Sequence, residues 1–147
     1  MSAIFKKLNL KDQKEILVLN PPKSFEAELA ALADVTIQRS IEGLQHIVFS
    51  LAFVTQQIEV DSLARAIAQR AEGDAILWFA YPKASSKKYT CDFNRDTGWA
   101  VLGELGFEGV RQVAIDADWS ALRFRRIEFI KSLTRAKKNR LTEQDKQ

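Results

Sequence analysis

Short blocks of consecutive apolar residues alternate along the chain with stretches in which apolar residues recur every three or four positions. The most apolar block covers residues 75–81, and it ends at Pro82, which cannot donate the next ladder hydrogen bond. A strand that is apolar on both faces needs cover on both, as in parallel sheets that lie between helices. Residues 75–81 are therefore predicted to form a central, buried strand.

Five more segments favour strands. Thr36, Gln38 and Arg39 suit an edge strand, because a core with two covered faces would not accept them. Only residues 116–120 separate the last two segments, which is too short for a crossover helix, so these strands are expected to form an antiparallel hairpin. The segments are 15–20, 35–39, 47–54, 110–115 and 121–129.

Helical spacing occupies three of the intervening stretches. Ser24 is a candidate N-cap for a helix of about ten residues, and Asp61 for a helix that Gly73 would end. A third helix is predicted from about Asn94 to a glycine stop at Gly106. Residues 1–15 suit a short leading helix or an ordered approach to the first strand.

This order of elements predicts a single doubly wound, Rossmann-like α/β domain with three layers. The sheet is expected to be six-stranded and mostly parallel, in the order 2-1-3-4-6-5, with an antiparallel C-terminal hairpin. The domain would cover residues 1–130, and residues 131–147 would form a basic, flexible C-terminal extension.

Length and composition exclude several classes of protein. A chain of 147 residues buries enough surface on folding for a single domain to be stable without disulfides. The single cysteine, Cys91, excludes an internal disulfide and a multi-cysteine metal site. Since no apolar run approaches the ~20 residues of a membrane span and no secretory signal is evident, we expect a cytoplasmic protein without membrane contact.

The net charge of +3 is distributed unevenly. Residues 1–120 carry 13 basic and 16 acidic side chains, whereas residues 121–147 carry 9 and 3. A basic end of this kind binds nucleic acid through counterion release, or it is simply a solvated tail. No aromatic residue follows Phe129 to stack on bases, and both interpretations stay open.

The carboxyl ends of parallel strands meet at one edge of a sheet, where α/β proteins bind ligands. Residues 20–23, 53–56, 81–86 and 116–120 should gather there. Lys23, Lys83 and a nearby helix N-terminus favour a small anion, and Tyr81 and Trp119 would wall a planar group. The alternative is that these residues only shape turns and packing. The candidate ligand-binding residues are Asn20, Lys23, Tyr81, Lys83, Ser85, Ser86, Asp116 and Trp119.

No catalytic or metal-binding constellation is predicted. Asp116 and Asp118 suit a hairpin turn, in which short acidic side chains bind local backbone. The one histidine, His46, falls at the start of a strand and away from the expected crevice. Cys91 lacks a second cysteine or a nearby histidine in the sequence. The cofactor, if the protein has one, is unknown.

Three motifs carry a resemblance to known proteins. They are Pro21-Pro22, the aromatic-Pro-Lys at residues 81–83, and Asp-x-x-Trp-Ser-x-Leu-Arg-Phe at residues 116–124. Together they resemble a bacterial family of single-domain proteins of unknown function. That resemblance implies a Rossmann-like fold and nothing about chemistry.

The element order also resembles, more distantly, a trimmed S-adenosylmethionine-dependent methyltransferase fold. That family has a Gly-x-Gly turn after the first strand and an acidic residue after the second. Here the corresponding positions hold Asn20-Pro21-Pro22-Lys23 and Arg39-Ser40. Proline removes a backbone donor, and arginine offers no acceptor to a ribose hydroxyl, so both differences affect cofactor binding.

We therefore expect a non-catalytic protein that binds a small anionic ligand or a protein partner, possible homodimers included, at the strand-end crevice. Two alternatives stay open. One is a divergent S-adenosyl- or nucleotide-dependent transferase, and the other is a protein that associates with nucleic acid through its basic tail.

Overall fold

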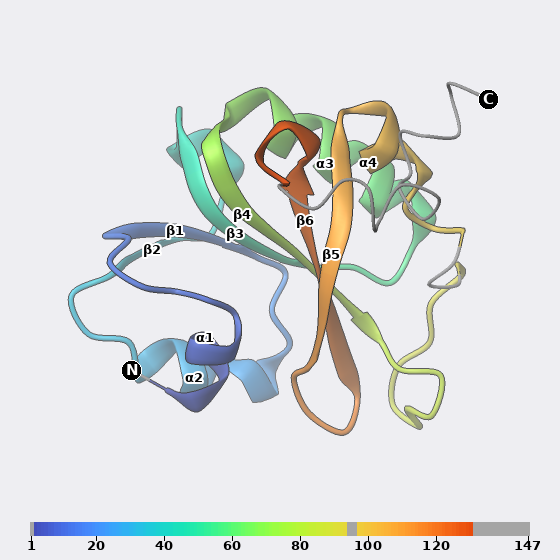
Figure 1. The fold of residues 1–147 in the computed structure, drawn as a ribbon. Helices are drawn as coiled ribbons and strands as arrows, with labels where there is room; N and C mark the ends of the chain where they lie inside the picture. The colour runs from blue at the N-terminus through green and yellow to red at the C-terminus, as the bar shows by residue number, and fades with distance from the viewer. Residues whose placement is uncertain (1, 94–96, 131–147) are drawn as a thin grey trace.

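The structure, a computed structural model, describes residues 2–93 and 97–130 (Figure 1). The predicted extension at 131–147 lies outside the described residues, so the domain boundary at residue 130 stays a prediction. The helices are α1 (Ala3–Lys7), α2 (Glu26–Ala30), α3 (Gln57–Arg70) and α4 (Ala100–Glu104), with 3-10 turns η1 (Lys23–Phe25), η2 (Ile41–Gly43) and η3 (Ile127–Phe129). The strands are β1 (Glu15–Leu19), β2 (Thr36–Gln38), β3 (Ile47–Phe53), β4 (Ala71–Pro82), β5 (Phe107–Ala114) and β6 (Trp119–Arg126).

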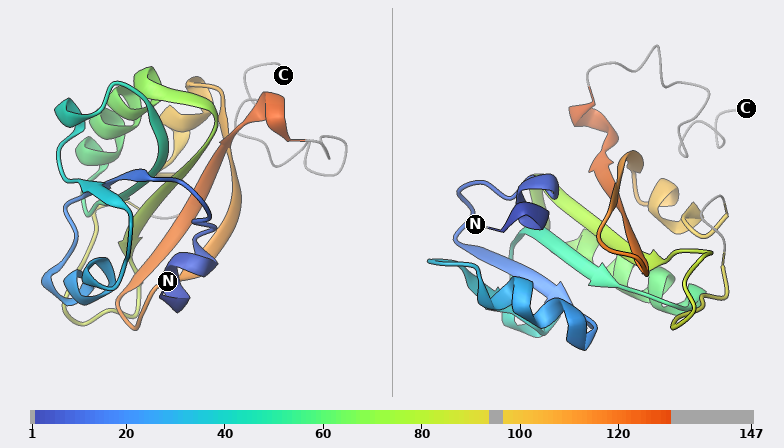
Figure 2. Two further views of the ribbon diagram at one scale, coloured as in Figure 1. Left: turned by 90° about the vertical axis from the view of Figure 1, so that its left-hand side faces the viewer. Right: turned by 90° about the horizontal axis from the view of Figure 1, so that it is seen from below.

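The strands form one six-stranded sheet in the order β2-β1-β3-β4-β6-β5. The pairs among β1, β2, β3 and β4 are parallel, whereas β6 runs antiparallel to both β4 and β5. The views in Figure 2 show this twisted sheet with helices on its two sides. The predicted fold class and strand order are thereby confirmed.

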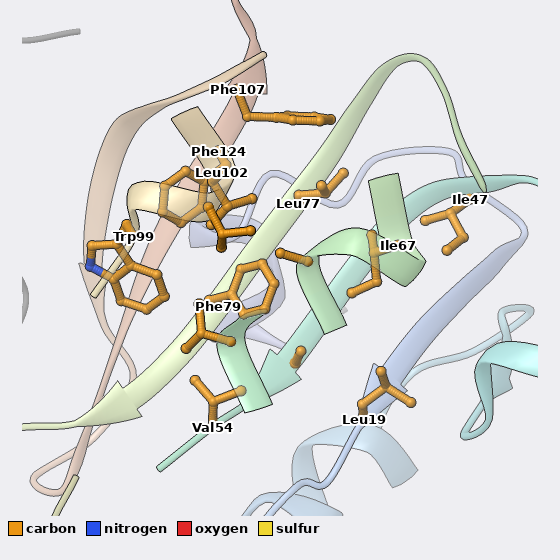
Figure 3. Packing of buried hydrophobic residues seen from close by; sticks show 14 of the residues in the cluster. Leu19, Ile47, Val54, Ile67, Leu77, Phe79, Trp99, Leu102, Phe107 and Phe124 are labelled. Atoms are coloured by element: carbon orange, nitrogen blue, oxygen red, sulfur yellow. The ribbon is translucent and has the colours of Figure 1, made fainter. Parts of the chain in front are cut away.

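Each face of the sheet carries its own apolar cluster. On the face that we call the α1 face, α1, η1 and α2 contribute Phe5, Phe25 and Leu29 to a cluster that contains Trp78 and Trp119 of the strands. On the opposite α3 face, Ile67 of α3, Leu102 of α4 and Trp99, which precedes α4, pack against Leu77, Phe79 and Phe124 (Figure 3). Because β4 contributes buried side chains to both clusters, it is the central strand that its uninterrupted apolar sequence predicts.

The helices begin at other residues than predicted. Ser24 lies inside η1, and α2 spans only five residues. Asp61 lies inside α3, which begins at Gln57 because Gln56 and Glu59 form a reciprocal capping box there. α4 begins at Ala100, and the predicted start near Asn94 lies outside the described residues.

A bulge at the start of β4 explains a second difference. Ile47 pairs with Ala71 and Phe49 with Ile76, so β4 contains extra residues that β3 does not match. Gly73, with φ +58°, lies in this bulge, so the prediction that it ends the helix is wrong. Helix α3 already ends at Arg70, because the backbone at Ala71 is extended. Gly106, with φ +88°, does follow α4 as predicted.

The carboxylate of Asp74, at the end of this bulge, makes two hydrogen bonds with Arg125 of β6, from Nε at 2.9 Å and Nη2 at 2.7 Å. The hydrogen bond from Arg125 lowers the pKa of Asp74 below its usual value. Since the folded-state pKa is the lower one, the pair stabilises the fold above about pH 4 and loses this effect as the pH falls through the folded-state pKa.

We expect Asp74→Asn to lower the free energy of unfolding at pH 7 by about 0.5–1 kcal/mol, a small effect because both side chains are about one-third exposed. Urea unfolding between pH 7 and pH 3 measures the difference from wild type, which should shrink toward the acidic end. The exposed Asp12→Asn serves as control. A difference that does not depend on pH would contradict the role of the carboxylate charge.

Candidate functional site

A cavity of about 230 Å³ opens on the α1 face at the carboxyl ends of β1 and β3. The chain leaves β1 toward α2 on the α1 face and leaves β3 toward α3 on the other face, so the connections diverge at this point of the sheet. Such a topological switch point is where open α/β sheets bind ligands. The lining residues are Asn20, Pro22, Phe53, Thr55, Glu59, Tyr89 and Trp119.

Three aromatic rings form the apolar part of the cavity. Trp119 packs edge-to-face on Phe53, with ring centroids 5.1 Å apart, and its centroid lies 4.9 Å from that of Tyr89. Phe53 and Trp119 are 2% and 3% exposed, so packing fixes both side chains. The buried indole nitrogen of Trp119 has no acceptor among the described residues. The site therefore offers a rigid aromatic wall.

Glu59 contributes the one acidic side chain of the lining. Its Oε1 accepts hydrogen bonds from the backbone N–H groups of Thr55 at 2.8 Å and Gln56 at 3.1 Å, as the N-terminal cap of α3 requires. These bonds hold the carboxylate in place beside the aromatic wall. The lining residues include no lysine or arginine, so their net charge is negative.

The turn after β1 forms the opposite rim. Asn20 has φ +56°, a left-handed conformation that asparagine tolerates better than most residues. Pro22 lines the cavity where a methyltransferase would present a glycine, and neither Pro21 nor Pro22 has an N–H group to offer a ligand.

The end of β2 also differs from the methyltransferase pattern. Arg39 binds both carboxylate oxygens of Glu26 in α2, each at 2.8 Å, where an acceptor for ribose would be needed. The cavity is moreover smaller than the roughly 300–1,000 Å³ of sites for drug-sized molecules. These residues do not fit S-adenosylmethionine in the mode that the resemblance implies.

Of the predicted site residues, Asn20 and Trp119 line the cavity. Tyr81 does not, because it lies on the α3 face against Phe93 and Trp99. Tyr81 pairs with Ser120 and Pro82 pairs with Trp119, and neighbouring positions of a strand point to opposite faces. The expected arrangement of Tyr81 and Trp119 as walls of one pocket is therefore wrong.

The two predicted lysines and Ser85 also lie outside the lining. Lys23 is exposed in η1, and Ser85 is exposed in the loop after β4. Lys83 is half-buried, and its backbone N–H donates to the carbonyl of Asp118 at 2.8 Å. The cavity thus lies at the edge of the sheet that the sequence indicated, but the predicted cations are not part of its lining.

Ser86 and Asp116 hold the aromatic wall in place. The hydroxyl of Ser86 donates to Asp118 Oδ1 at 2.9 Å and accepts from the backbone N–H of Tyr89 at 3.1 Å. Asp116 Oδ1 accepts from the backbone N–H groups of Asp118 at 2.8 Å and Trp119 at 2.9 Å. The predicted hairpin role of Asp116 is confirmed, and neither Ser86 nor Asp116 lines the cavity itself.

We expect Ser86→Ala to lower the free energy of unfolding by about 1 kcal/mol, because the substitution leaves Asp118 and the N–H of Tyr89 without their partner. The neighbouring, exposed Ser85→Ala is a matched control and should change the stability by less than about 0.5 kcal/mol. Urea unfolding followed by circular dichroism measures both variants. Equal effects of the two substitutions would contradict the positioning role of Ser86.

The sequence placed Pro22, Phe53 and Thr55 at this edge without naming them as ligand-binding residues, and it missed Glu59 and Tyr89 altogether. Glu59 had a usable signal, since it stands three residues after Gln56 in the spacing of a capping box. Tyr89 had none, because its position depends on the contact of Ser86 with the distant Asp118.

The other candidate side chains lie outside this cavity. His46 is exposed, with its Nδ1 at 2.6 Å from Glu72 Oε2, and the thiol of Cys91 contacts the carbonyl of Phe93 at 3.0 Å. Within residues 2–93 and 97–130, no three histidine, cysteine or acidic side chains gather as a metal site requires. In the same part of the chain, every helix is too short or too polar to span a bilayer.

No protein-family model and no curated protein sequence matches the chain. Among solved structures, it is similar to an S-adenosylmethionine-dependent methyltransferase from Aquifex aeolicus, with a TM-score of 0.56 and 12% identity over 84% of this chain and 88% of the other. It is also similar to the fibrillarin pre-rRNA processing protein of Methanococcus jannaschii, with a TM-score of 0.52 and 14% identity over 79% and 67% of the two chains.

A third similar structure is phosphoethanolamine N-methyltransferase 2 of Haemonchus contortus, in complex with phosphomonomethylethanolamine and S-adenosylhomocysteine. Its TM-score is 0.53 at 10% identity, and the match covers 88% of this chain but only 39% of the longer protein. At these identities the similarity defines the fold. The chain has the Rossmann-like fold of S-adenosylmethionine-dependent methyltransferases.

Proposed function

We propose that the protein is a non-catalytic binding protein with a methyltransferase-like fold, and that its switch-point cavity takes a compact, planar ligand that is neutral or positively charged. The observation that carries this proposal is the chemistry of the lining, in which Phe53, Tyr89 and Trp119 lie together with the fixed carboxylate of Glu59. Aromatic faces attract planar groups and cations.

The charge of the lining argues against the anion expected from the sequence. Lys23 and Lys83 are not among the lining residues, whereas Glu59 is. A negative ligand would meet this carboxylate with no cation in the lining to offset the repulsion. A protonated amine or a base with N–H donors would instead find acceptors in Glu59 and Asn20.

The size of the cavity supports a fragment-sized ligand. About 230 Å³ is less than the space of a typical drug-sized ligand but suits one ring system with a short substituent. Ligands of this size can gain up to about 1.5 kcal/mol per heavy atom, so micromolar binding, which needs about 8 kcal/mol, is within reach.

Three compounds that each contain a planar, two-ring aromatic group test the proposal by thermal shift: tryptamine as a cation, adenosine as a neutral compound, and indole-3-acetate as an anion. We expect tryptamine and adenosine to raise the melting temperature and indole-3-acetate to leave it unchanged. A ligand at ten times its Kd stabilises by about 1.4 kcal/mol, which corresponds to about 3–6 °C for a domain of this size.

Glu59→Gln is the matched variant, because glutamine retains an oxygen to cap α3 but removes the charge. In this variant, tryptamine should raise the melting temperature less than in wild type, whereas the effect of adenosine should be largely unchanged. Stabilisation by indole-3-acetate alone, or no response to any of the three compounds, would overturn the proposed ligand class.

A divergent S-adenosyl-dependent transferase is the second candidate, and the similar solved structures favour it. The two prolines after β1 and the engaged Glu26–Arg39 pair argue against it. Calorimetric titration with S-adenosylhomocysteine tests this second candidate, which requires saturable binding that is tighter than that of adenosine alone. A flat titration at about 1 mM would remove the transferase candidate.

A further inference from the structure

A row of side chains crosses three strands on the α1 face, about four residues along β6 from the cavity. Arg123 of β6 lies directly opposite Trp78 of β4 on one side and Arg111 of β5 on the other. Trp78 is completely buried, Arg123 is half-buried, and Arg111 is exposed. We call Arg111 and Arg123 the arginine pair.

Two like charges directly opposite each other on antiparallel strands repel, so a fold normally places an acidic residue at one of these positions. Within the described part of the chain, neither arginine side chain makes a hydrogen bond or an ion pair, and the buried Nε of Arg123 has no acceptor. Desolvation first, and then the charges of Arg125 and Arg111, lower the pKa of Arg123, while the charge of Asp74 partly opposes them. The pair therefore has unused donors and an excess of positive charge.

The neighbouring carboxylates have other partners. Asp74 binds Arg125 with both oxygens. Glu108 is buried opposite Arg125 in the register, and it has an interaction of its own. The charge of Asp74 also acts on Arg123, but within the described residues no carboxylate forms an ion pair with Arg111 or Arg123. The arginine pair can therefore bind an anion from outside the described chain.

The arginine pair is continuous along the chain with the basic C-terminal end. Strand β6 and the turn η3 lead directly into residues 131–147, which carry six basic and two acidic side chains. The sequence therefore adds more positive charge a few residues after the strand that holds Arg123. This combination suits an extended polyanion better than a single small ion.

We propose that the arginine pair binds the phosphate backbone of a nucleic acid without sequence specificity. Guanidinium groups bind phosphate oxygens in a bidentate fashion, and contacts of this kind position a nucleic acid without reading its bases. Trp78, the third member of the row, is buried and offers no ring for stacking on bases. No large apolar side chain of this row is exposed to anchor it in a membrane.

Fluorescence anisotropy with a labelled single-stranded oligonucleotide of about 20 nucleotides tests this proposal on the full chain. We expect binding that weakens between about 50 and 200 mM salt. The double variant Arg111→Gln/Arg123→Gln should lower the slope of log K against log salt by about 1.4, because each phosphate contact to a single strand contributes about 0.7. Its affinity at low salt should fall about tenfold or more.

The matched control removes two exposed positive charges elsewhere, as Lys14→Gln/Arg65→Gln. It should retain most of the affinity. Arg111→Gln alone keeps the proposal falsifiable if the double variant is unstable, because Arg111 is exposed, and it should lower the slope by about 0.7. Lys137→Gln/Lys138→Gln in the full chain measures the separate contribution of the basic end.

Four results would overturn the proposal. They are the absence of salt-dependent binding by wild type, an Arg111→Gln variant that binds as wild type does, binding to phosphatidylserine vesicles but not to the oligonucleotide, and stabilisation by inorganic phosphate without oligonucleotide binding. The last result would assign the pair to a small anion instead.

Discussion

Trp78→Ala is expected to lower the free energy of unfolding by about 3–5 kcal/mol. Trp78 is 0% exposed at the centre of the α1 face, and its indole N–H donates to the carbonyl of Leu8 at 2.8 Å. Alanine would leave a large cavity between the sheet and α1, together with a buried carbonyl that has lost its donor. With a total stability of about 5–15 kcal/mol, such a variant would be folded only in part under mild stress.

Trp78→Phe separates the two contributions, because phenylalanine fills most of the space but cannot donate to Leu8. We expect an intermediate loss of about 1–3 kcal/mol, the cost of an unsatisfied buried polar group. Urea unfolding followed by circular dichroism measures both variants. An alanine variant within 1 kcal/mol of wild type would show that α1 does not pack on this strand.

Trp119→Ala is expected to lower the free energy of unfolding by about 3 kcal/mol, at the lower end of the range for buried tryptophans. Trp119 loses its contacts with Phe53 and Tyr89 in this variant. The cavity beside it is open at its rim, so water can enter the vacated space, which reduces the cost of the void. The same substitution should abolish the response to tryptamine.

Trp119→Phe is the appropriate control, because it retains an aromatic ring against Phe53 and should stay closer to wild type in stability. If Trp119→Ala destabilises the protein as much as Trp78→Ala does, the space beside Trp119 does not admit water. If a folded Trp119→Ala protein still responds to tryptamine, this compound binds elsewhere.

The strand order was predictable because the hydrophobic patterns in this chain are unambiguous. Residues 75–80 are apolar without interruption, and the short linker at 116–120 leaves an antiparallel return as the available geometry. These are local properties of the sequence. The carboxyl edge of the sheet followed from the same reasoning, and Asn20 and Trp119 do line a cavity there.

It was harder to predict which face of the sheet each side chain occupies. A shift of one residue in the register moves every side chain of a strand to the opposite face. Tyr81 and Trp119 belong to adjacent strands, yet they occupy opposite faces since Tyr81 pairs with Ser120. Tyr89 reaches the cavity through a loop that is fixed by a contact distant in sequence. Neither relation is encoded in a local pattern.

Neither edge strand of the sheet is well suited to pair with a strand of another molecule. On one side β2 has only three residues, and on the other β5 is interrupted by a register shift between Gly109 and Arg111, where a positive charge also stands. A short or kinked and charged edge resists strand addition by a second molecule. The register shift beside Arg111 should therefore reduce edge-to-edge aggregation at high protein concentration.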